Sequence, residues 1–102
     1  MPKHEIELLA PAWFDLEAIA EYHLLVVGPR SARKITDKIL NDLKRLESFP
    51  LSCPSVPYKE LAEHGYRMLI CGKYVCIYRF IGDIVLIYHI VAAASNYPAL
   101  FK

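Results

Sequence analysis

The side chains that could carry out chemistry in this chain are few and widely spaced. The four histidines are His4, His23, His64 and His89. They share no metal-ligand spacing, and no His-x-x-x-His pair occurs. The chain has neither a Ser-His-Asp spacing nor a glycine-rich phosphate loop. We therefore expect no metal site and no cofactor.

The cysteines also argue against a metal site and against a disulfide framework. They are Cys53, Cys71 and Cys76, an odd number without a Cys-x-x-Cys motif. If Gly72-Lys73 forms a two-residue turn, Cys71 and Cys76 fall diagonally on one face of a hairpin. We interpret both as small reduced hydrophobic residues of a cytoplasmic protein.

Length and composition predict one compact domain that spans residues 1–102. The formal net charge is +1, which gives no strong electrostatic indication of nucleic-acid binding. Hydrophobic residues make up 55% of the chain, yet no apolar run reaches the length of about 20 residues that spans a membrane. Glu5, Glu7 and Pro11 interrupt the region where a signal peptide would lie. The surplus apolar surface either fills the core well or faces a partner protein.

Two helices are expected in the N-terminal half. The first runs from Ala12 to Val27 and ends at Gly28-Pro29. Its apolar stripe consists of Trp13, Leu16, Ile19, Ala20 and Leu24. The second runs from Ser31 to Ser48, with Ser31 as its N-cap. Its buried stripe consists of Ala32, Ile35, Ile39, Leu43 and Leu46.

Strands are expected on both sides of these helices. Residues 3–9 alternate in part between polar and apolar types and predict a first strand. Residues 65–80 predict a β-hairpin, because Gly72 can supply the positive φ that its tight turn requires. Residues 84–91 predict a further strand, after a turn at Gly82-Asp83. Residues 49–64 contain three prolines and predict an irregular loop with a short helical turn at 60–63. The expected fold is α+β, in the order β-α-α-β-β-β, with a two-helix hairpin packed on an antiparallel sheet.

This order of elements, together with particular residues, resembles the toxins of the RelE/ParE superfamily of type II toxin–antitoxin systems. The matching pieces are Gly65-Tyr66-Arg67-Met68-Leu69, Tyr74 to Arg79, Ile87-Tyr88 and Asn96-Tyr97-Pro98-Ala99-Leu100-Phe101. The resemblance covers essentially the whole chain. It is closer to the ParE-like branch, whose members are associated with poisoning of DNA gyrase, than to the branch that cleaves RNA.

The resemblance also raises metal-independent cleavage of messenger RNA on the ribosome, the activity of the RelE-like branch. Such cleavage needs a base for the ribose 2′-hydroxyl, cations against the phosphate and an acid for the leaving oxygen. The candidates are Glu60 or Glu63 as base, Arg67 and Arg79 as phosphate clamps, and His89 and Tyr97 as acids. Each also has a structural interpretation. The arginines can pair with acidic neighbours, Tyr97 can be a packed aromatic, and His89 can be a structural histidine.

Two features of the sequence weaken the cleavage hypothesis. Alternation along the hairpin places Arg67 on one face and Arg79 on the other, so neither face carries an array of cations. After the last strand, relatives often carry His-Gly and an arginine–aspartate pair. This chain has Ala92-Ala93-Ala94-Ser95-Asn96 there, and three alanines can neither donate, accept nor stack. We interpret this segment as a target-binding or altered motif, either by natural drift or by introduced substitutions.

The resemblance implies a cognate antitoxin as partner. Its tail would order on the toxin by laying an amphipathic helix in an apolar groove or by adding a strand to a sheet edge. One candidate surface is the outward side of the first helix, namely Phe14, Tyr22, Leu25 and Val26. The other is an uncovered face or edge of the sheet. Alternatively, residues 25–27 continue into the core. A homodimer or a toxin–antitoxin hetero-oligomer is also conceivable.

Three functional hypotheses follow from the sequence. The first is a toxin that binds a cellular target, DNA gyrase, and is neutralised by its antitoxin. The second is a ribosome-dependent endoribonuclease of the RelE type. The third is a non-toxic module that binds the antitoxin but is inactivated at residues 92–95.

Overall fold

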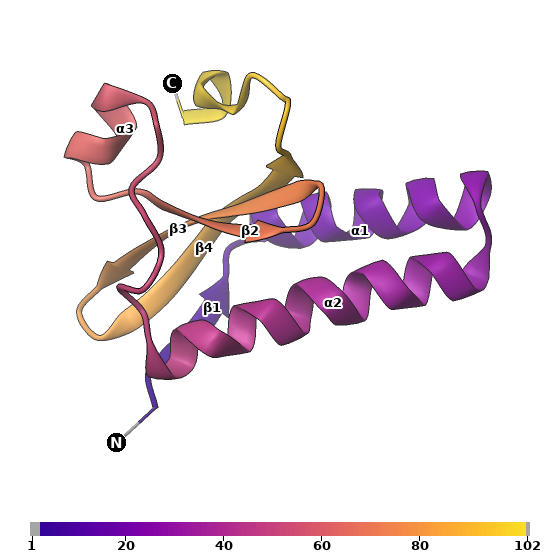
Figure 1. The fold of residues 1–102 in the computed structure, drawn as a ribbon, viewed down its shortest axis with the longest axis horizontal. Helices are drawn as coiled ribbons and strands as arrows, with labels where there is room; N and C mark the ends of the chain where they lie inside the picture. Colours follow the sequence, from indigo (N-terminus) through magenta and orange to yellow (C-terminus); the bar gives the residue numbers. More distant parts are fainter. Residues whose placement is uncertain (1–2, 102) are drawn as a thin grey trace.

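A computed structural model describes residues 3–101 of the chain, which fold as a four-stranded sheet with helices on both faces (Figure 1). The elements in chain order are β1 (Glu5–Leu8), α1 (Ala10–Val26), α2 (Pro29–Ser48), α3 (Lys59–Glu63), β2 (Arg67–Cys71), β3 (Tyr74–Ile81), β4 (Ile84–Ala92) and the 3₁₀ helix η1 (Tyr97–Phe101). The expected order of strands and long helices is confirmed. No helix within residues 3–101 is both long and apolar enough to cross a membrane.

The strands lie in the order β1-β4-β3-β2. β2, β3 and β4 pair antiparallel, and Gly72 has a φ of 63° in the tight turn between β2 and β3, as expected. β1 departs from the expected antiparallel arrangement, because it pairs parallel with β4, from Glu5 opposite Ile84 to Leu8 opposite Ile87. The reason is topological: the two-helix hairpin returns the chain to the sheet, so that the last strand runs beside the first in the same direction.

α1 and α2 lie side by side and antiparallel, and they extend beyond the sheet at the turn that joins them (Figure 1). α1 buries Ala12, Leu16 and Ile19 against the sheet. The predicted stripe is partly wrong, because Trp13 is 48% exposed and Leu24 is 46% exposed. Leu16 and Ile19 of the predicted stripe are buried, so the buried face of α1 overlaps the predicted one but is shifted toward Ala12.

The boundary between the two helices also differs from the prediction. α2 begins at Pro29, and its N-cap is Gly28, whose φ of 139° suits glycine. The prediction of Ser31 as N-cap is therefore wrong. Ser31 lies inside α2, and its Oγ atom is 3.1 Å from Nδ1 of His23 on α1. The buried face of α2 is otherwise as predicted, with Ile39, Leu43 and Leu46 in the core.

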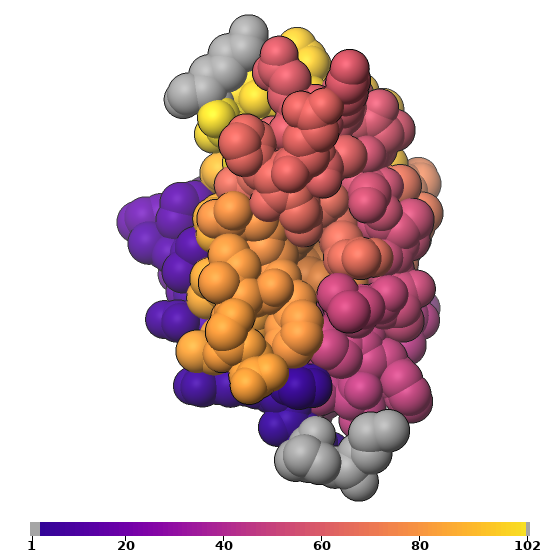
Figure 2. All heavy atoms as spheres, turned by 90° about the vertical axis from the view of Figure 1, so that its left-hand side faces the viewer, coloured from indigo at the N-terminus to yellow at the C-terminus, as the bar shows by residue number. Residues whose placement is uncertain are grey.

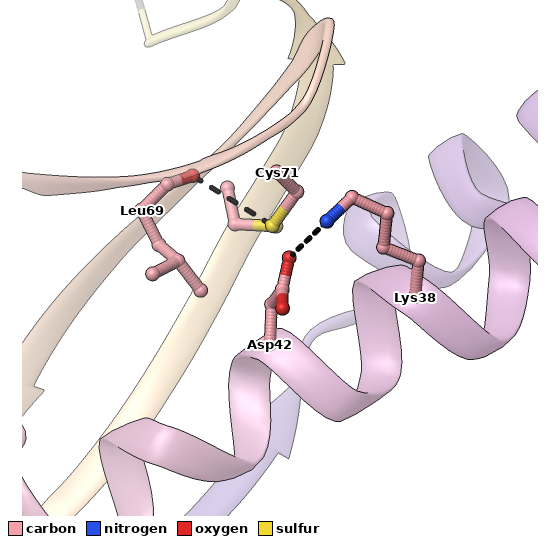
Figure 3. Close-up of polar contacts among 5 residues, drawn as sticks. Lys38, Asp42, Leu69 and Cys71 are labelled. Atoms are coloured by element: carbon pink, nitrogen blue, oxygen red, sulfur yellow. Dashed lines mark hydrogen bonds and ion pairs between the residues drawn. The ribbon is translucent and has the colours of Figure 1, made fainter.

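The main core lies between the two long helices and one face of the sheet. Cys71 and Cys76 are fully buried there, and their sulfur atoms are 3.8 Å apart, which confirms their expected position on one hairpin face. A hydrogen bond with Cys71, followed by burial, raises the pKa of the Cys76 thiol far above its ordinary value. Cys76 is therefore a protonated packing group. Figure 3 draws the 4.0 Å contact between the Cys71 sulfur and the carbonyl oxygen of Leu69, together with the Lys38–Asp42 ion pair of α2.

A second, smaller core covers the opposite face of the sheet. It consists of Val56, Leu61, Val75, Ile77 and Tyr97. α3 and η1 form this cover, and they lie next to each other at one end of the molecule (Figure 2). Both faces of the central strand β3 are consequently buried, which explains its continuous apolar sequence.

The irregular loop before α3 is tied to the main core by one buried hydroxyl. Tyr78 is fully buried on β3, and its hydroxyl donates a 2.8 Å hydrogen bond to the carbonyl oxygen of Pro50. Replacing Tyr78 with Phe leaves that carbonyl without its partner. We expect Tyr78→Phe to lower the free energy of unfolding by about 1–2 kcal/mol in urea denaturation. Tyr22→Phe is the matched control, since Tyr22 is 58% exposed, and equal stability of the two variants would contradict this role of Tyr78.

Candidate functional site

A β-bulge organises the face of the sheet that is turned away from the long helices. Ile77 pairs with His89, but the next residue, Tyr78, pairs with Ile87, so Tyr88 is an extra residue in β4. The bulge brings the consecutive residues Tyr88 and His89 to the same side. Both rings contact Phe101 of η1, at centroid distances of 6.4 Å and 5.3 Å. Strict alternation would have separated these two side chains.

Arg79 is held by the aromatic side chains on this face. Its guanidinium carbon lies 4.8 Å from the ring centre of Tyr66 and 5.0 Å from that of Tyr88. Nε and Nη2 of Arg79 donate hydrogen bonds of 3.1 Å and 2.6 Å to the Tyr88 hydroxyl, and Nη1 donates one of 3.3 Å to the carbonyl of His64. Cation–π contacts and charge-assisted hydrogen bonds of this kind fix an arginine in place. Burial raises the pKa of Tyr66, although Arg79 opposes the shift.

Arg67 lies on the other face of the sheet. It pairs with Tyr78 in the β2–β3 register, and its Nη1 donates a 2.6 Å hydrogen bond to the carbonyl of Cys53. Within residues 3–101 neither Arg67 nor Arg79 forms an ion pair with a carboxylate, so the expectation of acidic neighbours is wrong. The guanidinium groups donate instead to backbone carbonyl oxygens and to the hydroxyl of Tyr88. The two arginines do not converge on a common position.

His89 has a structural partner on α1. Its Nδ1 is 2.8 Å from Oδ2 of Asp15, and the same oxygen accepts a 3.0 Å hydrogen bond from the backbone N–H of Ile90. Since a carboxylate can only accept, Nδ1 of His89 carries the proton. This pair favours the interpretation of His89 as a structural histidine. Asp15 thereby fastens the first turns of α1 to β4.

The remaining cleavage candidates lie near η1. Tyr97 is buried, and its ring packs edge-on against Tyr58 at 5.1 Å. Burial raises the pKa of the Tyr97 hydroxyl, and Tyr58 adds to this shift, so the hydroxyl stays protonated at neutral pH. Glu60 is exposed on α3 and lines a shallow pocket of about 350 Å³ together with Pro98 and Phe101. Glu63 is also exposed, at the end of α3.

The alanine-rich segment leaves the sheet at the end of β4. Ala92, Ala93, Ala94, Ser95 and Asn96 are all exposed. The backbone N–H of Ala93 donates to the carbonyl of Lys73 in the β2–β3 turn. Both the N–H and the hydroxyl of Ser95 donate to the carbonyl of Ala92, at 3.0 Å and 2.7 Å. The segment is thus a compact turn beside the hairpin.

α1 carries a large exposed apolar surface. The side chains proposed for antitoxin binding are exposed to extents of 69% for Phe14, 58% for Tyr22, 76% for Leu25 and 63% for Val26. The alternative in which residues 25–27 continue into the core is therefore wrong. Val27, Trp13 and Leu24 add to the exposed apolar surface of this helix. The exposed apolar residues cluster most densely in the last turns of α1, from Tyr22 to Val27, and such clusters are typical of sites where another protein docks.

The sequence analysis missed a hollow beside this surface, at the end of α1. The hollow has a volume of about 500 Å³ and lies between α1, α2 and the β2–β3 turn. His23 lies in its wall, with Nε2 3.1 Å from the hydroxyl of Tyr74. The sequence held one signal for this arrangement, since His23 continues the buried series Ala12, Leu16 and Ile19 at helical spacing.

Comparison with known proteins identifies the family. The family described as ParE toxin of type II toxin–antitoxin system, parDE, matches residues 6–97. The chain belongs to the ParE toxin family. This agrees with the resemblance found in the sequence, including its preference for the ParE-like branch. No sequence among curated proteins matches the chain.

Solved structures of toxin–antitoxin systems share the fold. The chromosomal ParDE system from P. aeruginosa has a chain with a TM-score of 0.76 and 22% identity, and the match covers 88% of this chain and 96% of that one. The toxin–antitoxin complex RelBE2 from Mycobacterium tuberculosis has one with a TM-score of 0.57 and 18% identity, covering 88% of this chain and 98% of that one. The α+β architecture is therefore that of RelE/ParE-like proteins.

The contact between α1 and β4 leads to a prediction about Asp15. Asp15→Ala removes the acceptor for the N–H of Ile90 and the partner of His89, so we expect a loss of about 1–3 kcal/mol in the free energy of unfolding. The amide of Ile90 should also exchange its hydrogen faster by NMR. Glu17→Ala, an exposed change one residue beyond Leu16 on the same helix, is the control. If both variants unfold alike and Ile90 keeps its protection, the carboxylate does not fasten α1.

Proposed function

We propose that this ParE-family toxin inhibits growth by binding a cellular target, DNA gyrase, and that a cognate antitoxin neutralises it in the cytoplasm. The observation that carries the proposal is that both arginines, His89 and Tyr97 are used in packing or in hydrogen bonds within the fold. Arg67 and Arg79 lie on opposite faces of the sheet, while a large apolar surface remains exposed on α1. Action through a binding surface fits this distribution better than bond cleavage does.

Metal-independent cleavage of RNA depends on cations placed against the developing charge of the phosphate. On the face that carries His89, the guanidinium of Arg79 is engaged by the Tyr88 hydroxyl and the carbonyl of His64. Nδ1 of His89 is engaged by Asp15, and Tyr97 is buried. A cleavage site here would require several of these contacts to break at once.

The exposed face of α1 supports the antitoxin part of the proposal. Phe14 and Leu25 lie eleven residues apart, which is about three helical turns, and an amphipathic segment of similar length can cover both. Burying the exposed parts of such side chains contributes roughly 1–2 kcal/mol each. We propose Phe14, Tyr22, Leu25 and Val26 as antitoxin contacts, and residues 92–96 as the segment that meets the target. A toxin–antitoxin hetero-oligomer follows from this arrangement.

The target is tested by two assays on the same purified protein. We expect the protein to inhibit DNA supercoiling by gyrase. When Ser95 and Asn96 are both changed to the bulky residue Trp, we expect the protein concentration that gives half-inhibition to rise at least about tenfold. We expect no cleavage within codons of a messenger translated in a reconstituted system. Ser52→Trp, an exposed change in the loop before α3, is the control for both assays.

Two other outcomes would redirect the assignment. Codon-dependent cleavage of messenger without any effect on gyrase would establish the endoribonuclease hypothesis, with Glu60, Arg67, Arg79, His89 and Tyr97 as its candidate residues. Silence in both assays, with growth arrest appearing only after His is placed at Ala92 and Arg at Ser95, would establish the module inactivated at residues 92–95.

A further inference from the structure

The 3₁₀ helix η1 ends in an aromatic side chain that fills a site on the sheet. Phe101 contacts three rings, at centroid distances of 4.7 Å for Tyr66, 6.4 Å for Tyr88 and 5.3 Å for His89. We call the space bounded by these three rings the ring slot. Tyr66 and Tyr88 are also the rings that hold the Arg79 guanidinium. Phe101 therefore occupies a site that lies directly beside a cation.

The two ends of η1 are held differently. Tyr97 at its start is 4% exposed and belongs to the second core. Leu100 near its end is 51% exposed, and Phe101 is half-buried. Within residues 3–101, no backbone hydrogen bond joins η1 to the sheet or to α3. Side-chain packing thus holds the end that carries Phe101, and segments attached in this way open at a low cost in free energy.

Phe101 also lines a second space, the hollow between η1 and α3. This hollow has a volume of about 350 Å³, and its lining includes Pro57, Tyr58, Leu61 and Pro98. Apolar and aromatic walls of this kind accommodate an aromatic side chain. The ring of Phe101 therefore has two adjacent apolar places, the ring slot that it fills and the hollow that is open.

We propose that η1 is a strap with two positions and that the ring slot is a docking site for the protein target. In the closed position Phe101 is a tethered occupant of the slot. In the open position the last residues of η1 pivot about Tyr97 into the hollow beside α3. An aromatic side chain of the target then enters the slot, and a carboxylate next to it pairs with Arg79. The inference rests on the proposed function, to which it adds the chemistry of the contact and a means of control.

The present occupant indicates what the slot accepts. It already holds a phenyl ring edge-on, at interplanar angles of 63° to Tyr66 and 78° to His89, which is a favoured arrangement of aromatic pairs. Arg79 supplies the second requirement. Within residues 3–101 it donates to a hydroxyl and to a carbonyl oxygen but forms no ion pair. A carboxylate beside the incoming ring would accept a charge-assisted hydrogen bond from it.

The position of the strap also fits contact with the target. η1 begins directly after residues 92–96, the segment proposed to meet the target. That segment is exposed, and the hydrogen bond from the Ala93 N–H to the Lys73 carbonyl is the last backbone tie to the hairpin before η1 within residues 3–101. The strap and the segment therefore form one continuous surface.

A nucleotide also combines a ring with an anion. Stable binding of nucleic acid depends on contacts to several phosphates, whereas Arg67 lies on the other face of the sheet and leaves Arg79 as the cation at the slot. Glu60 and Glu63 are exposed on α3, which lies next to η1 (Figure 2), and both would repel phosphates. One carboxylate on a peptide suits this site better than a chain of phosphates.

Two short fluorescent peptides test the strap, one with Asp-Phe-Asp at its centre and the other with Asn-Phe-Asn. A tethered ring that competes for the slot lowers the apparent affinity by the fraction of molecules that are open. By fluorescence anisotropy we expect Phe101→Ala to bind the acidic peptide at least about tenfold more tightly than the parent protein does. We also expect this variant to prefer the acidic peptide over the amide peptide by at least about tenfold. Equal affinity of parent and variant would overturn the strap, and equal affinity for the two peptides would overturn the role of Arg79.

The matched control is Leu100→Ala, which truncates an exposed apolar side chain of the same helix. It should bind the acidic peptide within about twofold of the parent. Arg79→Gln in the Phe101→Ala background should remove the preference for the acidic peptide. If Leu100→Ala gains as much affinity as Phe101→Ala, the gain comes from general loosening of η1 and the ring slot is not the site.

A measurement on the unmodified protein is independent of how well the variants fold. During NMR titration with the acidic peptide, we expect the amide signals of residues 98–101 to move together with those of Tyr66 and Tyr88. Binding that leaves the signals of η1 in place would show that the peptide docks elsewhere. A uridine oligonucleotide that binds Phe101→Ala as tightly as the acidic peptide does would assign the slot to nucleic acid and overturn the proposal.

Failure of this inference and failure of the proposed function give different results. We expect Phe101→Ala to inhibit gyrase supercoiling at a lower concentration than the parent does, because its slot is already open. If parent and variant inhibit gyrase equally and bind neither peptide, only the strap is wrong. If the peptides bind as expected but neither protein inhibits gyrase, the proposed target is wrong and the slot serves another protein.

Discussion

The arrangement of this molecule depends on how the open edge of β4 is satisfied. The parallel pairing with β1 ends at Leu8 and Ile87, after which the chain continues as α1. Within residues 3–101 no strand pairs with β4 on that side beyond Ile87. A backbone N–H left without a partner there would cost stability. Asp15 accepts from Ile90 and from His89 at the same time. This contact fixes the rotation of α1, which puts Ala12, Leu16 and Ile19 inside and turns Phe14 and Leu25 to solvent.

The bulge at Tyr88 has a comparable effect on the opposite face of the sheet. It gathers Tyr66, Tyr88, His89 and Phe101 into one aromatic cluster around the Arg79 guanidinium. Groups whose types suggest acid–base catalysis are thereby used to hold η1 against the sheet. Tyr66, Arg79, Tyr88 and Phe101 all belong to the segments that carry the family resemblance, and their contacts hold η1 and the sheet together.

The sequence predicted the elements and the buried face of α2 because hydrophobic periodicity is strong there, and glycine marked the hairpin turn. The prediction from sequence failed where contacts between distant elements determine the structure. Nothing in the alternation of β4 reveals the extra residue at Tyr88, and nothing local to α1 reveals that Asp15 reaches an edge far along the chain. The stripe that contains Trp13 and Leu24 was predicted to face the core because its residues are apolar. Hydrophobic periodicity reflects residue type alone and does not show on which side of the helix the sheet lies.

The two surfaces proposed for function meet at Ala92. This residue lines the hollow over Tyr74 and also begins the exposed segment that runs to Asn96. The hydrogen bond from Ala93 to Lys73 keeps the start of that segment against the cationic turn. A chain docked on Tyr22 and Val26, which line the same hollow, would therefore lie against the segment proposed to meet the target. An antitoxin segment docked there would block access to residues 92–96 by occupying adjacent space, without any change in the shape of the protein.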